Sequence, residues 1–270
     1  MAEAAEGVAG ECPYQQAWQI CDPHAKLKAT LALPEPKHPP LRAALGLEPG
    51  RPEHPRLISP RQVPRRGLGS VEGRIGLLHA VAHIEFNAIN LALDALIRFG
   101  PDMPLSFSRD WWSVAVDEAR HFQMLEQRLQ CLGAGYGDLP AHNGLWEAAQ
   151  KTAHDVLARM ALVPRVLEAR GLDVTPPMMA RLAQVGAQEE VAILDVILRE
   201  EVRHVAIGSR WYAHLCTQRK LPRLQTFHAL VAKYLPGFQS PGPFNHQARA
   251  EAGFQRAEYE GLAQLTDSFS

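Results

Sequence analysis

Six residues of types that bind metals form two copies of one pattern in this sequence. In each copy a glutamate precedes a Glu-x-x-His motif by 33 residues, and the second copy follows the first by 83 positions. The two copies are Glu85, Glu118 and His121, followed by Glu168, Glu201 and His204. In carboxylate-bridged two-metal proteins, a glutamate from each of two helices joins a Glu-x-x-His pair from each of the other two. The spacing therefore predicts a two-metal site inside an all-α four-helix bundle.

Each Glu-x-x-His motif places its two side chains on one side of a helix. Residues three apart are about 60° from each other around the helix axis, so Glu118 projects with His121, and Glu201 with His204. Mixed carboxylate and imidazole ligands suit iron and manganese, whereas structural zinc sites typically contain thiolates. We expect two iron ions, with manganese or a mixed manganese–iron pair as the alternatives.

Apolar stripes surround the glutamates of the pattern. The residues that share a helix face with Glu85 are Leu78, Ala82, Ile89, Ala92 and Leu96. Burying several carboxylates with neither a cation nor a proton is costly, so solvated surface acids explain the stripe poorly. The alternative is a bundle that has lost its metal. A further Glu-x-x-His at Glu35–His38 contains a proline within a proline-rich stretch, and we expect it to bind nothing.

The direction of the third helix decides whether the second half of the pattern can share a site. Pro164 and the stretch Gly171–Pro177 interrupt this helix, which is expected to start near Asn143. If it ended at Gly171, Glu168 and Glu201 would lie roughly 30 Å apart along the bundle axis. If the chain kinks at Gly171–Pro177 and continues to a turn near Gly186, the two glutamates reach similar heights. We therefore expect the kink and the later turn.

Three regions are expected along the chain. Residues 1–69 form a short helical start and an extended arm, residues 70–220 form the bundle, and residues 221–270 form helices packed on its outside. Nine of the 21 prolines fall within residues 34–64, which excludes a helix there. The arginines at the end of this arm are Arg51, Arg56, Arg61, Arg65 and Arg66. A strap on the protein's own surface is the favoured interpretation, and RNA contact is the alternative.

The bundle helices are expected from Ser70 to Gly100, from about Ser108 to Leu132, through the third segment, and onward to about Gln218. Ser70 has the side chain of a helix N-cap, and Gly100-Pro101 stops the first run. Two more helices are expected in the last region, at Pro222–Tyr234 and Asn245–Leu265.

Several neighbours of the pattern admit two interpretations. Glu200 lies four residues before His204 and could replace Glu201, although the repeat favours Glu201. His79 and His83 lie about 120° and 160° from Glu85 around the helix, which favours core positions over metal binding.

The acidic and basic residues beside the two motifs also admit two interpretations. Asp117, Arg120 and Arg203 could orient the ligands, but surface salt bridges are the simpler account.

Composition narrows the class of protein. The chain has 270 residues, 46% of them hydrophobic, and a formal net charge of −1, so it can bury a large core and has no global attraction to polyanions. The N-terminus resembles no signal peptide, no uninterrupted apolar run is long enough for a membrane span, and the four cysteines form no CxxC pair. These features predict a cytoplasmic protein that does not enter the membrane.

Several segments resemble a known family. They read LLHAVAHIEFNAINLALDALIRF, DWWSVAVDEARHFQML, LEARGLDVTPP, REEVRHVAIGSRWY and GPFNHQARAEAGF. They are similar to the bacterial ferritin-like domain-of-unknown-function family, a distant relative of tRNA-modifying di-iron hydroxylases. The resemblance covers about residues 49–262. It implies a ferritin-like bundle with a di-iron centre at the six residues of the pattern, and it implies no substrate.

The leading functional hypothesis is an oxidase or oxygenase that uses O₂, an unidentified electron donor and an unknown small-molecule or RNA substrate. The first alternative is an iron-handling or metal-stabilised scaffold protein without catalysis. Storage would need a many-subunit cage, whereas the arm and the C-terminal helices favour a monomer or dimer. The second alternative is a tRNA-modifying hydroxylase that uses the arginine-bearing arm.

Overall fold

The computed structural model describes residues 12–42, 46, 48–62, 67–238, 240 and 242–263. Within these residues every regular element is a helix, and one isolated β-bridge joins Leu57 to Ala141. The all-α prediction is therefore confirmed for the described part of the chain. Arg65 and Arg66 of the arm, and the expected end of the last helix at Leu265, lie outside the described residues.

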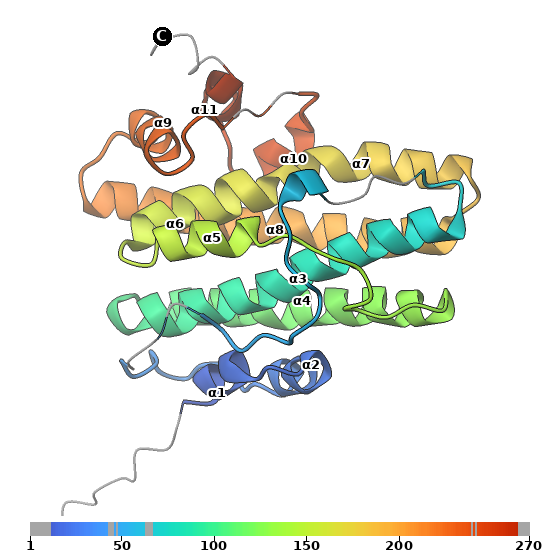
Figure 1. The fold of residues 1–270 in the computed structure, drawn as a ribbon. Helices are drawn as coiled ribbons and strands as arrows, with labels where there is room; N and C mark the ends of the chain where they lie inside the picture. Colours follow the sequence, from blue (N-terminus) through green and yellow to red (C-terminus); the bar gives the residue numbers. More distant parts are fainter. Residues whose placement is uncertain are drawn as a thin grey trace, which may run out of the picture.

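Four long helical segments lie side by side in two layers (Figure 1). One layer pairs α3 (Val71–Phe99) with α4 (Leu105–Cys131), joined through the short helix η2 (Gly100–Asp102). The other pairs α8 (Gln188–Gln218) with a composite segment, in which α6 (Val156–Leu162), a π-helical stretch η3 (Val163–Glu168) and α7 (Ala169–Gln184) follow one another. The Ser70 hydroxyl accepts a hydrogen bond from the Gly73 N–H and caps α3, as predicted.

The third segment differs from the prediction at its start. The stretch from Asn143 forms a separate helix, α5 (Gly144–Lys151), and the chain leaves helical geometry before α6. Asp155 then caps α6, because its carboxylate accepts a hydrogen bond of 3.1 Å from the Leu157 N–H. The expected single helix from Asn143 is thus wrong: a new N-cap starts the bundle helix twelve residues later.

The sequence predicts a kink at Gly171–Pro177. Helix α7 continues through Pro176 and Pro177 without a break in the helix, and the irregular stretch is the π-helix around Pro164. Pro176 has no N–H for the carbonyl of Leu172, four residues before it. That carbonyl accepts a hydrogen bond of 3.2 Å from the Asn245 side chain, so a distant part of the chain compensates the proline.

The turn that was predicted near Gly186 is confirmed. Helix α7 ends at Gln184, α8 begins at Gln188, and Gly186 takes a φ of +77°, a left-handed conformation that favours glycine. The second layer is therefore a long antiparallel pair. The register that brings Glu168 level with Glu201 follows from this turn.

The described part of the arm docks on the first layer. After α1 (Pro13–Gln19) and α2 (Pro23–Leu31), the chain is extended except for the single turn η1 (Pro60–Gln62). The buried Lys26 ammonium donates hydrogen bonds to the Trp18 and Gly50 carbonyls and to the Asn90 side chain on α3. Arg51 donates to the Asn87 side chain at 3.1 Å, so this arginine faces the protein.

The C-terminal region packs against the composite segment. Helix α9 (Arg223–Tyr234) matches the prediction, but the second expected helix is split into α10 (His246–Glu251) and α11 (Arg256–Glu260), followed by η4 (Gly261–Ala263). Gly253, with a φ of +82°, lies in the break. Arg165 of η3 forms a buried ion pair of 2.8 Å with Glu258 of α11, which fixes this region to the third segment.

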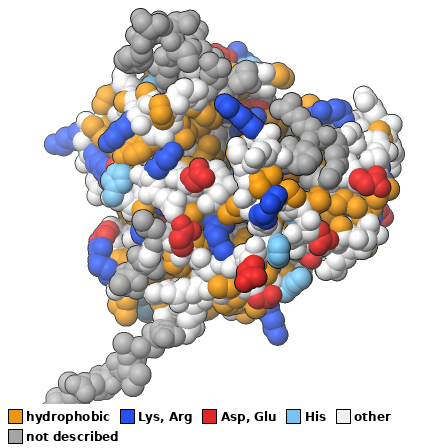
Figure 2. All heavy atoms as spheres, in the orientation of Figure 1, with side chains coloured by type: hydrophobic (Ala, Val, Ile, Leu, Met, Phe, Trp, Pro, Cys, Tyr) orange, Lys and Arg blue, Asp and Glu red, His pale blue; other side chains and the backbone are white. Residues whose placement is uncertain are grey.

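One described segment, Val71–Asp102, is long and apolar enough to cross a membrane by length and composition alone. Its most apolar window of 18 residues is 83% buried inside the protein, and core helices pass the same test, so it is weak support for a span. On the face shown in Figure 2, acidic and basic side chains are interspersed with hydrophobic ones. No large area of a single charge sign stands out on that face.

Two glycines test how the segments fit together. A Cβ added at Gly208 of α8 would overlap the ring of Pro164, whereas a Cβ at Gly171 of α7 would meet nothing within 4 Å. We expect Gly208→Ala to lower the free energy of unfolding by roughly 1–3 kcal/mol, and Gly171→Ala to raise it by about 0.5–1 kcal/mol. Urea denaturation measures both. Equal effects of the two variants would contradict the close contact between α8 and η3.

Candidate metal centre

The four segments bring the predicted residues together in the middle of the molecule. Glu85 comes from α3, Glu118 and His121 from α4, and Glu201 from α8; each offers a ligand atom, and these atoms all lie within 4.8 Å of one another. His204 joins them, because its Nδ1 lies 3.2 Å from a Glu201 oxygen. Five of the six residues of the pattern thus form one connected cluster.

Glu118 lies at the centre of this cluster. Its Oε1 is 2.9 Å from Nδ1 of His204, and its Oε2 is 3.2 Å from Nδ1 of His121. Each Nδ1 also faces a second carboxylate: Glu85 at 3.1 Å for His121, and Glu201 for His204. The arrangement has two similar halves that share one carboxylate, which is the ligand topology of a bridged metal pair.

Glu168 is placed apart from the others. Its half-buried carboxylate lines the same cavity as Glu85, Glu118 and Glu201, but it makes no hydrogen bond or ion pair within the described part of the chain. Burial, and then the charges of Glu201 and Glu118, raise its pKa well above the usual range. Glu168 therefore lies beside the cluster, but its carboxylate forms no hydrogen bond with either histidine of the pattern.

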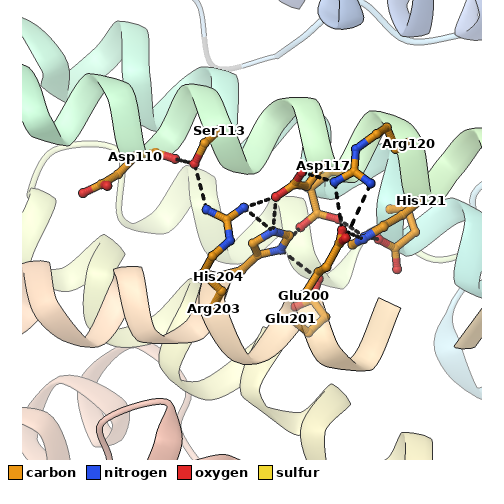
Figure 3. Close-up of polar contacts among 11 residues, drawn as sticks. Asp110, Ser113, Asp117, Arg120, His121, Glu200, Glu201, Arg203 and His204 are labelled. Carbon is orange, nitrogen blue, oxygen red and sulfur yellow. Dashed lines mark hydrogen bonds and ion pairs between the residues drawn. The ribbon is translucent and has the colours of Figure 1, made fainter. Parts of the chain in front are cut away.

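A second set of carboxylates contacts the far side of each imidazole (Figure 3). Nε2 of His121 lies 2.8 Å from Glu200 on α8, and Nε2 of His204 lies 3.2 Å from Asp117 on α4. Arg120 forms ion pairs with both of these acids. Each helix thus supplies the acid that holds the other helix's histidine.

This exchange corrects the simpler sequence interpretation, in which Asp117 and the two arginines form surface salt bridges. Arg203 does pair with Asp117, but Asp117 also contacts His204. The signal was present in the sequence: each motif has an acid four residues before its histidine, Asp117 in the first and Glu200 in the second. An imidazole held at Nε2 by a carboxylate presents Nδ1 in a fixed direction.

The other ambiguous neighbours are also placed. Glu200 contacts Nε2 of His121, on the side away from Glu118, so the cluster contains Glu201 and not Glu200. His79 accepts a hydrogen bond from the Gly137 N–H, and His83 contacts the Tyr136 hydroxyl at 2.9 Å. Both lie in a separate polar group on α3, in agreement with the core positions expected for them.

The shifted pKa values of the cluster residues show that the buried carboxylates lack enough positive charge around them. Burial lowers the pKa of a histidine, yet contacts with Glu118 and Glu85 outweigh it and raise the pKa of His121 to about 11. The pKa of His204 is raised to about 10, against burial, by Glu118 and Glu201. Burial and the Glu118 charge raise the pKa of Glu85. His121, His204 and Glu85 therefore retain protons, and these protons supply the positive charge that bound cations would otherwise supply.

The donor set fits a metal pair. Four carboxylates converge with only two imidazoles, so two divalent cations would balance their charge and displace the protons. The ligand atoms are oxygen and Nδ1 nitrogen, which iron and manganese accept. His121 with Glu85 would hold one ion, His204 with Glu201 the other, and Glu118 is placed between the two.

A cavity of about 530 Å³ adjoins the cluster. It lies between α3, α7 and α8, and most of its lining is aliphatic, including Val81, Leu167, Met178, Leu194 and Ile197. Sequence reasoning missed it. Its members recur at helical spacing around the glutamates, for example Leu194 and Ile197 before Glu201, but the same spacing describes an ordinary packed core.

The family model described as "Protein of unknown function (DUF455)" matches residues 14–260. The chain belongs to this family. An "Uncharacterized protein" of Haemophilus influenzae is 48% identical to this DUF455 member over 221 residues, covering 79% of this chain and 76% of that protein. No solved structure matches the chain. The expected family of unknown function is thus confirmed, and its ferritin-like character remains a prediction.

The exchanged carboxylates lead to a prediction about metal affinity. Asp117→Asn and Glu200→Gln should each lower the affinity for Mn²⁺ by about 10- to 100-fold, because the imidazole loses the group that orients it. Asp195→Asn is the matched control, since Asp195 lies on α8 and, among the described residues, its side chain pairs with the exposed Arg199. Calorimetric titration measures the affinities. If Asp117→Asn and Glu200→Gln bound Mn²⁺ as tightly as the control, Asp117 and Glu200 would form surface salt bridges only.

Metal uptake should also depend on pH. Since the raised pKa values leave His121 and His204 protonated near neutrality, a metal at Nδ1 must displace those protons. A higher pH removes the competitor, so apparent affinity should rise, roughly tenfold per pH unit for each proton released. Mn²⁺ titrations in two buffers with different ionisation enthalpies count the protons. Affinity independent of pH between about 6 and 8 would contradict metal binding at these nitrogens.

Proposed function

We propose that this DUF455 protein is a ferritin-like, carboxylate-bridged di-iron protein that acts as an O₂-dependent oxidase or oxygenase. The observation that carries the proposal is Glu118, whose two oxygens face Nδ1 of His121 and Nδ1 of His204. A carboxylate shared in this way between two half-sites is what a metal pair requires, and a structural ion pair does not.

The chain supplies ligand geometry and an apolar space beside the ligands. Asp117 and Glu200 fix the imidazoles and stabilise positive charge on them, while the apolar cavity adjoins the carboxylates. When bound, a ferrous pair supplies the electrons that reduce O₂. The Glu168 carboxylate, which forms no hydrogen bond or ion pair with other described residues, has the most freedom to change its position as charge develops.

The cavity favours catalysis over iron handling. Iron on its way to storage needs a polar route, whereas the space beside Glu85 and Glu201 is lined mainly by aliphatic side chains. An apolar chamber of this size suits an organic molecule. The RNA alternative gains no support from Arg51, which faces Asn87 of the protein itself.

Anaerobic loading with Fe²⁺, followed by exposure to O₂, tests the proposal. We expect two iron ions per chain and stoichiometric O₂ consumption, and Glu118→Gln should lose both because it removes the shared carboxylate. Glu189→Gln is the matched control, since Glu189 lies on α8 and pairs with Arg128 at the surface. Bound iron at 100 times its Kd should also raise the free energy of unfolding by about 2.7 kcal/mol. Folded protein that takes up no iron, or iron-loaded protein that leaves O₂ unchanged, would contradict the proposal.

A further inference from the structure

The cavity opens at an apolar rim between α3 and α7. Ile84 of α3 is 42% exposed and Val174 of α7 is 38% exposed, and both line the cavity. Exposed aliphatic side chains at the rim of an aliphatic chamber cost free energy in water unless a ligand covers them. The opening is therefore suited to a molecule with an apolar body.

The two ends of the cavity carry opposite charge. Its inner end is formed by Glu85, Glu118, Glu168 and Glu201, which repel an anion in the absence of metal. At the rim, the side chain of the exposed Arg170 makes no hydrogen bond or ion pair with any other described residue. Its guanidinium is thus free to meet an anionic group that stays at the surface.

We propose that the substrate is a small amphiphile whose hydrocarbon body fills the cavity and whose carboxylate lies at Arg170. This orientation keeps the anion away from the glutamates and presents carbon–hydrogen bonds to the metal pair. The role of this molecule as a substrate rests on the proposed di-iron function, whereas its binding does not. A nucleobase fits less well, because its polar edges would find mostly aliphatic partners in the chamber.

Binding of saturated carboxylates tests this proposal. Calorimetry with the purified full chain, its metal content measured in parallel, should show hexanoate, octanoate and decanoate binding with affinity that rises about fourfold per methylene group. Such a slope requires a hydrocarbon chain that leaves water completely. Equal affinity for all three acids would overturn the proposal.

Charge reversal at the rim tests the carboxylate position. Arg170→Glu should weaken decanoate binding by roughly threefold to tenfold and leave 1-decanol binding unchanged, and the effect should shrink at high salt. Arg181→Glu is the matched control, because Arg181 is exposed on the same helix but does not line the cavity. Equal losses in the two variants, or a loss of 1-decanol binding in Arg170→Glu, would overturn this orientation.

Filling the cavity separates specific binding from adsorption. Ala88→Phe and Thr175→Trp place rings in the chamber from α3 and α7, and each should lower decanoate affinity at least tenfold in protein that melts cooperatively. Undiminished binding in both would show adsorption elsewhere and overturn the proposal. Displacement of decanoate by tRNA would assign the chamber to a modified nucleoside and likewise overturn it.

The two proposals fail in different ways. Protein that binds two irons and consumes O₂, but binds no carboxylate, would overturn the substrate class and leave the di-iron function standing. Chain-length-dependent binding to protein that takes up no iron would support the substrate class and contradict the di-iron function.

Discussion

The rest of the structure depends on one electrostatic constraint, the burial of several carboxylates around two imidazoles. Glu85 and Glu118 are 4% and 1% exposed, so neither can rely on water to solvate its charge. Each imidazole contacts carboxylates at both ring nitrogens. Nδ1 faces the glutamates of the cluster, and Nε2 faces Asp117 or Glu200 on the outer side. The raised pKa values of His121 and His204 place protons on these imidazoles near neutrality, at the atoms to which a metal would bind.

The constraint requires four chain segments to meet at one level, and both ends of the chain contribute to that. The N-terminal arm braces α3 on the face away from the cluster, through Asn87 and Asn90, two and five residues beyond Glu85. The C-terminal region braces the third segment, because Asn245 satisfies the carbonyl that Pro176 leaves free. The appendages are therefore supports for ligand-bearing helices.

The close contact between α8 and η3 serves the same purpose. Gly208, one turn after His204, gives room for the ring of Pro164, and Glu168 lies one turn after that proline. A π-helical stretch widens the backbone there and changes the direction of the side chains that follow. Pro164, which was expected to interrupt the third helix, lies in this π-helical stretch, which ends at Glu168.

How much of the structure the sequence could predict depends on whether a pattern links residues far apart in the chain or only neighbouring ones. The exact repeat of a glutamate and a Glu-x-x-His motif carried long-range information, and it predicted both the cluster and the turn at Gly186. The unbroken course of α7 through Pro176 and Pro177 was not foreseen, because a proline's effect on a helix depends on which remote group, here the Asn245 side chain, supplies the missing hydrogen bond. The exchange of Asp117 and Glu200 between helices was not recognised, because a short-range motif does not reveal which side chains face one another across the bundle.

The shared carboxylate is the central claim, and it can be observed directly. Crystals grown with Fe²⁺ under anaerobic conditions, with anomalous data collected on both sides of the iron absorption edge, would locate the metal. We predict two iron peaks flanking Glu118, one beside Nδ1 of His121 and one beside Nδ1 of His204. A single peak, or iron bound only at Asp117 and Glu200 on the outer side of the imidazoles, would contradict the account.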